Sequence, residues 1–100
     1  MKKTIALVTN NKECAQKLQQ EAEKLNVVIK YEVQSARGIE NKLNNDDIID
    51  SDAVLFSVYG SVEEIEDIER FIDLEYYEVD SDIIIKTPEI VIKEIIEDLK

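Results

Sequence analysis

Short apolar runs alternate with amphipathic segments along this chain of 100 residues, and that alternation restricts the fold more than any other feature. The apolar runs have the length of strands and are rich in Val, Ile, Leu and Tyr: 4–8, 27–34, 53–58 and 76–79. Strands that alternate with helices favour parallel pairing through right-handed crossovers. We therefore predict one α/β domain over residues 1–100. It is a small three-layer sandwich, whose four-stranded parallel sheet has the order 2-1-3-4 and helices on both faces.

Three amphipathic helices are predicted between and after the strands. The first starts at residue 13, and apolar residues at helical spacing form its buried stripe: Ala15, Leu18, Ala22 and Leu25. The second starts at Ser61, which forms a capping box with Glu64, and it buries Val62, Ile65, Ile68 and Ile72. The third starts with Thr87 as N-cap and Pro88 in the first helical position, and it buries Ile92, Ile95, Ile96 and Leu99.

The charge balance excludes several classes of partner. Lysine and arginine number 12 against 23 Asp and Glu, a net charge of −11, which disfavours non-specific binding to nucleic acids or anionic membranes. Histidine is absent, which removes the commonest general base and metal ligand. The acidic run at 63–69 is interpreted as a solvated helix face and not as a metal site. We expect a cytoplasmic protein without metal, cofactor, signal peptide or membrane insertion.

The loop after the first predicted strand is the default place for a ligand, because α/β sheets bind ligands beyond the carboxyl ends of their strands. The loop contains no glycine, and its phosphate-binding candidates are Thr9, Asn10, Asn11 and Lys12. Cys14, the single cysteine, follows in the first turn of the helix. The helix dipole and Lys12 favour a thiolate there, whereas Glu13 opposes it. The alternative is that Cys14 is a small, half-buried helix residue at a position that also suits alanine.

Four doubly wound families place diagnostic residues at these positions, and the sequence matches none of them. A receiver domain requires acids after the first strand and at the end of the third, where this chain has Thr9-Asn10-Asn11 and Ser57. A flavodoxin requires a glycine-rich phosphate loop. A tyrosine-phosphatase loop requires Arg six residues after its cysteine, where this chain has Gln20. A dinucleotide-binding fingerprint is absent as well.

The segment VQSARGIENKL, residues 33–43, is expected to form a turn and a short helix around 39–43. It resembles the segment after the second strand of fructose-specific IIB domains of the bacterial sugar phosphotransferase system. The matching residues are Gln34, Gly38, Ile39, Glu40, Asn41 and Leu43. A second match is to the family's acidic helix and following strand, through Asp47, Ile48, Asp52, Ala53 and Val54. Further pieces recur with the family's spacing at 69–71, 77–79 and 88–89, so the likeness covers residues 4–99.

The resemblance implies a role in phosphoryl transfer during sugar transport. In the family, a cysteine two residues after a threonine accepts a phosphoryl group from a IIA phosphohistidine and passes it to sugar at the membrane IIC subunit. Here Thr9 matches the threonine, but Asn11 occupies the cysteine's position. The family's Pro-Thr-Gly and His-Thr elements are missing, and the loop is shorter.

Two functions are consistent with this pattern, and the sequence leaves both open. In the first, the chain is a IIB component that relays phosphoryl groups between IIA and IIC, with Cys14 as acceptor in a phosphocysteine intermediate. In the second, it is a non-catalytic IIB-like module that docks a phosphocarrier or a regulator.

Overall fold

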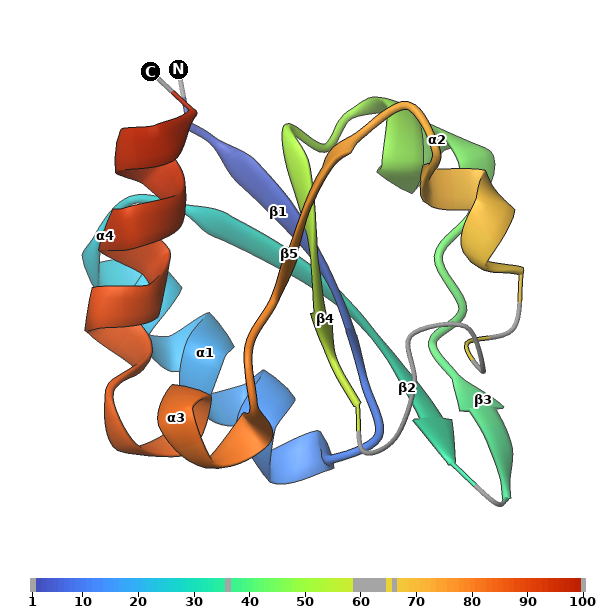
Figure 1. Ribbon diagram of the computed structural model, residues 1–100, viewed down its shortest axis with the longest axis horizontal. Helices are drawn as coiled ribbons and strands as arrows, with labels where there is room; N and C mark the ends of the chain where they lie inside the picture. The colour runs from blue at the N-terminus through green and yellow to red at the C-terminus, as the bar shows by residue number, and fades with distance from the viewer. Residues whose placement is uncertain (1, 36, 59–64, 66, 100) are drawn as a thin grey trace.

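The computed structural model describes residues 2–35, 37–58, 65 and 67–99, which build a sheet with helices on both faces (Figure 1). Five strands pair in the order β3-β2-β1-β4-β5. Their bounds are β1 Thr4–Thr9, β2 Val28–Ser35, β3 Gly38–Glu40, β4 Ala53–Ser57 and β5 Glu75–Glu78. Strand β1 pairs in parallel with β2 and β4, and β4 pairs in parallel with β5. The α/β class and the order of the four parallel strands are therefore confirmed.

The fifth strand corrects two predictions, because the sheet is mixed and the helix expected around 39–43 does not form. Strand β3 pairs antiparallel with β2, with Ser35 opposite Gly38 and Val33 opposite Glu40. Gly38 has φ +115°, a conformation that favours glycine, and it starts β3 directly after the turn. Asn41 also has a positive φ, of 58°, so two residues of this segment lie outside the helical region.

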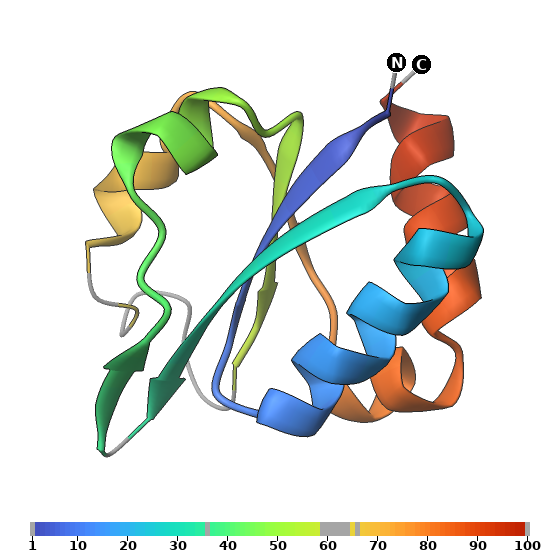
Figure 2. The same ribbon diagram turned by 180° about the vertical axis from the view of Figure 1, so that it is seen from behind.

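Three helices cover one face of the sheet: α1 Lys12–Lys24, α3 Ser81–Lys86 and α4 Pro88–Asp98 (Figures 1 and 2). The predicted stripe of α1 is confirmed, since Ala15, Leu18 and Ala22 are buried against the sheet. Helix α4 starts at Pro88 as predicted, but the hydroxyl of Thr87 donates to the carbonyl of Ile83 and makes no capping bond. The sequence did not predict α3, a six-residue helix with three consecutive β-branched isoleucines, which have lower helix propensity.

Two short elements, α2 Asn45–Ile49 and the 3₁₀ helix η2 Ile68–Phe71, lie on the other face (Figure 1). They pack over a second core of Ala6, Val8, Val54, Phe56 and Phe71. The Ser61–Glu64 capping box predicted for this region lies outside the described residues, as does Val62.

The buried stripe predicted to follow that capping box is partly wrong. Ile65 is buried, but Ile72 is 82% exposed. Asp67 has a positive φ of 54°, and the 3₁₀ geometry after it has about three residues per turn, so the helical spacing used in the prediction does not apply. No helix in the described part of the chain is long and apolar enough to cross a bilayer.

Candidate functional site

The loop after β1 is held by its own side chains. Thr9 is fully buried, and its Oγ1 accepts a hydrogen bond from the backbone N–H of Asn11 at 3.1 Å. The Oδ1 atom of Asn11 accepts from the backbone N–H groups of Glu13 at 3.0 Å and Cys14 at 3.3 Å. Asn11 is therefore the N-cap of α1, and its side chain occupies two of the amides that a helix start offers to an anion.

Cys14 lies on the side of α1 that faces the sheet, and its side chain is fully buried. Its Sγ lies 3.7 Å from Oγ of Ser57, which in turn lies 2.9 Å from Oγ of Ser81. Burial raises the pKa of the Cys14 thiol, and hydrogen bonds with Ser57, Thr9 and Ser81 oppose that rise without cancelling it. The direction is opposite to the one expected from the helix dipole. We refer to Thr9, Cys14, Ser57 and Ser81 as the hydroxyl–thiol cluster.

Asn10 and Lys12 lie at the rim of this edge. Asn10 is half-buried, and its Oδ1 atom is buried without a hydrogen-bond donor among the residues that the structure describes. Lys12 is exposed, and its Nζ lies 3.7 Å from Oε2 of Glu40 in the β3 hairpin. The five candidates therefore separate into two groups. Thr9, Asn11 and Cys14 are engaged internally, whereas Asn10 and Lys12 face the rim.

Sequence reasoning missed the roles of Ser57 and Ser81 in this cluster. Thr9 and Ser57 end two neighbouring parallel strands and are directly opposite in register, so their side chains share a face. The expected pairing of these two strands could therefore have indicated that Ser57 lies next to Thr9. Ser81 is the first residue of α3, and it entered the cluster only because the unpredicted helix brings it under β4.

The segment that carries the family resemblance has structural roles beside this edge. Gly38 starts β3 after the turn, and Glu40 faces Lys12. The amide of Asn41 donates to the carbonyl of Tyr31 at 2.7 Å, which closes the hairpin onto β2. These residues build the rim around the first loop.

A second buried polar cluster lies on the opposite face of the sheet and was not predicted. Glu32 is fully buried in β2, and its two carboxylate oxygens accept from the two terminal nitrogens of Arg70 at 2.9 and 3.0 Å. Gln34 and the backbone N–H of Leu43 donate to the same carboxylate at 2.7 and 2.8 Å. We refer to Glu32, Gln34 and Arg70 as the carboxylate–guanidinium cluster.

The carboxylate of Glu32 stays ionised despite its position. Burial would raise its pKa, but the hydrogen bonds from Arg70, Gln34 and Leu43 and the positive charge of Arg70 outweigh that effect, so the pKa is lowered. Glu32 likewise raises the pKa of Arg70. The pair joins β2 to η2 across 38 residues of sequence, and nothing in the local pattern of either segment indicates it.

The described residues include no group of three or more His, Cys, Asp or Glu side chains that could hold a metal ion. Within the acidic run interpreted as a solvated helix face, Glu63 and Glu66 lie outside the described residues. Asp67 is exposed and accepts from Nζ of Lys42 at 2.7 Å. This contact lowers the pKa of Asp67.

Known structures share this fold over nearly the whole chain. The enzyme IIB subunit of the phosphotransferase system of Escherichia coli K12 is 34% identical, with TM-score 0.83, over 98% of this chain and 94% of that one. A domain of the fructose-specific IIABC component of Borrelia burgdorferi is 29% identical, with TM-score 0.81, over 94% and 93%. A predicted fructose-specific IIB of Escherichia coli, 22% identical over 98% and 90% with TM-score 0.83, shares the fold. No protein-family model and no curated protein matches the sequence.

Proposed function

Because the chain belongs to the fructose-specific IIB family of the bacterial sugar phosphotransferase system, we propose that it docks a IIA phosphocarrier without accepting the phosphoryl group itself. The observation that carries this proposal is the burial of Cys14, whose side chain has no exposed surface. A phosphoryl acceptor must present a nucleophilic atom to the donor's phosphorus. A buried thiol with a raised pKa is neither accessible nor in its reactive thiolate form.

The residue at the family's acceptor position supports the same conclusion. Asn11 carries an amide, which is not a nucleophile, and its oxygen is used to cap α1. The N–H groups of Glu13 and Cys14 are therefore already bonded to protein, and a phosphate would have to displace Asn11 to reach them. Both parts of an acceptor site, the attacking atom and the anion cradle, are altered in this loop.

The rim of the edge supports a retained docking role. Lys12 and Arg37 are exposed beside the β3 hairpin, and the Lys12 ammonium is held near Glu40 at the surface. These residues lie beside the loop that contains the family's acceptor position, Asn11 in this chain.

Phosphoryl relay through Cys14 is the second candidate, favoured by one observation. Three hydroxyl groups, those of Ser57, Thr9 and Ser81, hydrogen-bond the thiol and partly offset the effect of burial on its pKa. In a relay, the phosphorus–nitrogen bond of the donor phosphohistidine breaks as a phosphorus–sulfur bond forms at Cys14. The phosphoryl group then passes to sugar at the membrane IIC subunit. This route requires the first turn of α1 to open.

Docking is tested by titrating the ¹⁵N-labelled chain with a fructose-type IIA protein. We expect saturable amide shifts in the loop after β1 and in the β3 hairpin. Lys12→Glu should raise the dissociation constant about tenfold, which is the effect expected from the loss of one charge contact at the rim. Lys24→Glu is the matched control, because Lys24 also forms a surface ion pair but lies at the other end of α1. Absence of saturable binding, or equal loss with both variants, would contradict docking at this edge.

A further inference from the structure

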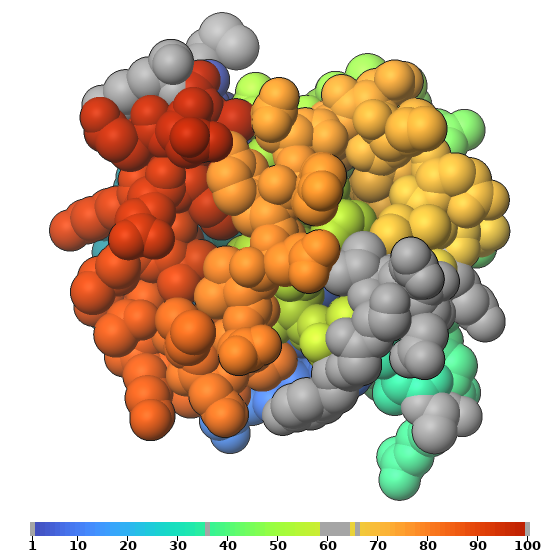
Figure 3. Space-filling view, in the orientation of Figure 1, coloured from blue at the N-terminus to red at the C-terminus, as the bar shows by residue number. Residues whose placement is uncertain are grey.

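An open apolar groove lies between β5 and η2, on the face of the sheet opposite α1. Its volume is about 510 Å³, within the range of sites that hold small ligands or a few side chains. Phe56 and Phe71 form its floor, and Ile72, Leu74 and Tyr76 line its walls. Figure 3 looks onto the β5 edge of the sheet, with atoms of β4 visible between those of β5 and those of η2.

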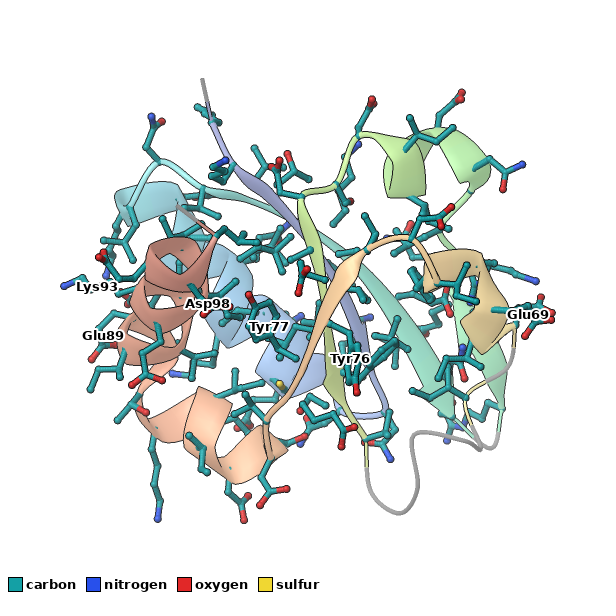
Figure 4. All side chains as sticks on the ribbon, turned by 45° about the horizontal axis from the view of Figure 1, so that its top comes forward. Glu69, Tyr76, Tyr77, Glu89, Lys93 and Asp98 are labelled. Atoms are coloured by element: carbon teal, nitrogen blue, oxygen red, sulfur yellow. The ribbon has the colours of Figure 1, made fainter. Side chains whose placement is uncertain are left out.

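Two of the large apolar side chains that line the groove are exposed. Ile72 is 82% exposed and Tyr76 is 65% exposed. Tyr76 and its neighbour Tyr77 point to opposite sides of β5, and Figure 4 shows Tyr77 directed toward Asp98 of α4 and Tyr76 directed away from it. The hydroxyl of Tyr77 donates to Asp98 at 2.5 Å and so has an internal role.

The floor and one wall of the groove are held in place. The rings of Phe56 and Phe71 meet edge to face, with centroids 5.7 Å apart. The guanidinium of Arg70 lies 4.7 Å from the centroid of the Phe71 ring and is held by Glu32. The carboxylate–guanidinium cluster therefore fixes η2, and with it Phe71. A preformed groove loses less conformational entropy when it binds a partner than a mobile groove does.

The rim of the groove is acidic. Glu69 and Glu78 line it, and Asp73, next to Ile72 in the sequence, is exposed. Two cations near the groove are already paired, Arg70 with Glu32 and Lys42 with Asp67. The chain as a whole has a net charge of −11. Protein-binding surfaces usually have an apolar centre and a polar or charged rim, and the charge of this rim is negative.

We propose that this groove binds a basic partner protein, through an amphipathic segment that inserts apolar side chains between Ile72 and Tyr76. Lysine or arginine side chains flanking that segment would meet Glu69 and Glu78. A second copy of this chain is disfavoured, because a two-fold contact would bring a −11 surface against itself. The proposal goes beyond the docking of a phosphocarrier, since Cys14 and its loop pack against the other core of the sheet.

The probe for the test is a synthetic amphipathic peptide of about 16 residues, built from leucine and lysine, titrated into the ¹⁵N-labelled chain. The matched probe has glutamate in place of every lysine. We expect saturable shifts confined to residues 68–78 with the lysine peptide. We expect none with the glutamate peptide.

Four variants locate the binding. Ile72→Ser should weaken binding of the lysine peptide about tenfold, whereas Ile90→Ser, at an exposed isoleucine of α4, should not. The double variant Glu69→Lys with Glu78→Lys should reverse the preference and bind the glutamate peptide. Lys12→Glu, the variant that tests docking at the carboxyl edge, should leave peptide binding unchanged. The docking proposal and the groove proposal can therefore fail independently of each other.

Two results would overturn the inference. The first is shifts spread over the acidic surface that Ile72→Ser does not reduce, which would indicate non-specific charge attraction. The second is a concentration-dependent dimer in sedimentation that Ile72→Ser abolishes, which would assign the groove to a second copy.

Discussion

Two buried polar clusters lie on opposite faces of the same sheet, and they differ in charge. The hydroxyl–thiol cluster contains small neutral groups, linked by contacts of 2.9 Å and 3.7 Å between Ser57 and its neighbours Ser81 and Cys14. The carboxylate–guanidinium cluster contains a full ion pair with a two-pronged geometry. The neutral cluster lies between the sheet and α1, next to the loop after β1, whereas the charged cluster lies on the other face of the sheet, near the carboxyl end of β2.

The difference indicates which face of the sheet depends on a buried pair of opposite charges. A buried charge is tolerated only while its partner stays in place, so Glu32 and Arg70 depend on each other. Neutral hydroxyl and thiol groups tolerate replacement better, because each loss leaves only a small cavity or an unpaired hydroxyl. The carboxyl edge can therefore change its residues at little cost, whereas the η2 face is fixed by its ion pair.

Breaking the ion pair should give the largest effect on stability. Arg70→Leu leaves the Glu32 carboxylate buried without a positive partner, and we expect a loss of about 3–5 kcal/mol in the free energy of unfolding. Urea unfolding followed by circular dichroism measures it. Arg37→Leu, at an exposed arginine, is the control and should change stability by less than about 0.5 kcal/mol. A loss below about 1 kcal/mol for Arg70→Leu would show that the charged cluster is no more constrained than the neutral one.

The pH dependence of the charged cluster should give a smaller effect. The pKa of Glu32 is lowered in the folded state, so its contribution is fully present above its ordinary value of 4.5 and is lost as the pH falls through the folded value. The difference in stability between the native chain and Glu32→Gln should therefore shrink as the pH falls below 4.5. Unfolding curves between neutral and acid pH measure it. A difference that stays constant or grows in acid would show that Glu32 is not a charged partner.

Replacing the thiol should give the smallest effect. Cys14→Ala removes one buried sulfur from a helix position that suits alanine, and we expect a loss of about 1 kcal/mol. The same urea experiment measures it. A loss as large as that of Arg70→Leu would show that the neutral cluster is as constrained as the charged one.

The sequence predicted those parts of the molecule that depend on local pattern. The alternation of apolar runs and amphipathic segments was sufficient for the order of the four parallel strands and for the stripe of α1. The β3 hairpin was missed because it depends on positive φ at Gly38 and Asn41, and the sequence pattern around 39–43 also indicates a short helix. The exposure of Ile72 was missed because η2 is a 3₁₀ helix and not an α-helix.

The place of the loop in the fold was predicted but its contacts were not, and its role as a binding site stays a prediction. The loop Thr9–Lys12 was placed correctly at the carboxyl edge of the sheet, because the chain order of strands and helices determines that edge. The burial of Cys14 and its contact with Ser57 depend on how α1 is rotated over the sheet, which a single sequence does not fix. The pair of Glu32 and Arg70 joins residues 38 positions apart, beyond the reach of any periodic pattern.

Whether this chain takes up a phosphoryl group is the most direct test of the account. The chain is incubated with a fructose-type IIA protein phosphorylated on its histidine, and the intact masses of both proteins are measured at neutral pH. A IIB protein that keeps the family's cysteine serves as the positive control. The account predicts that the control gains one phosphoryl group while this chain's mass is unchanged. A phosphoryl gain on this chain that disappears in Cys14→Ser would contradict it.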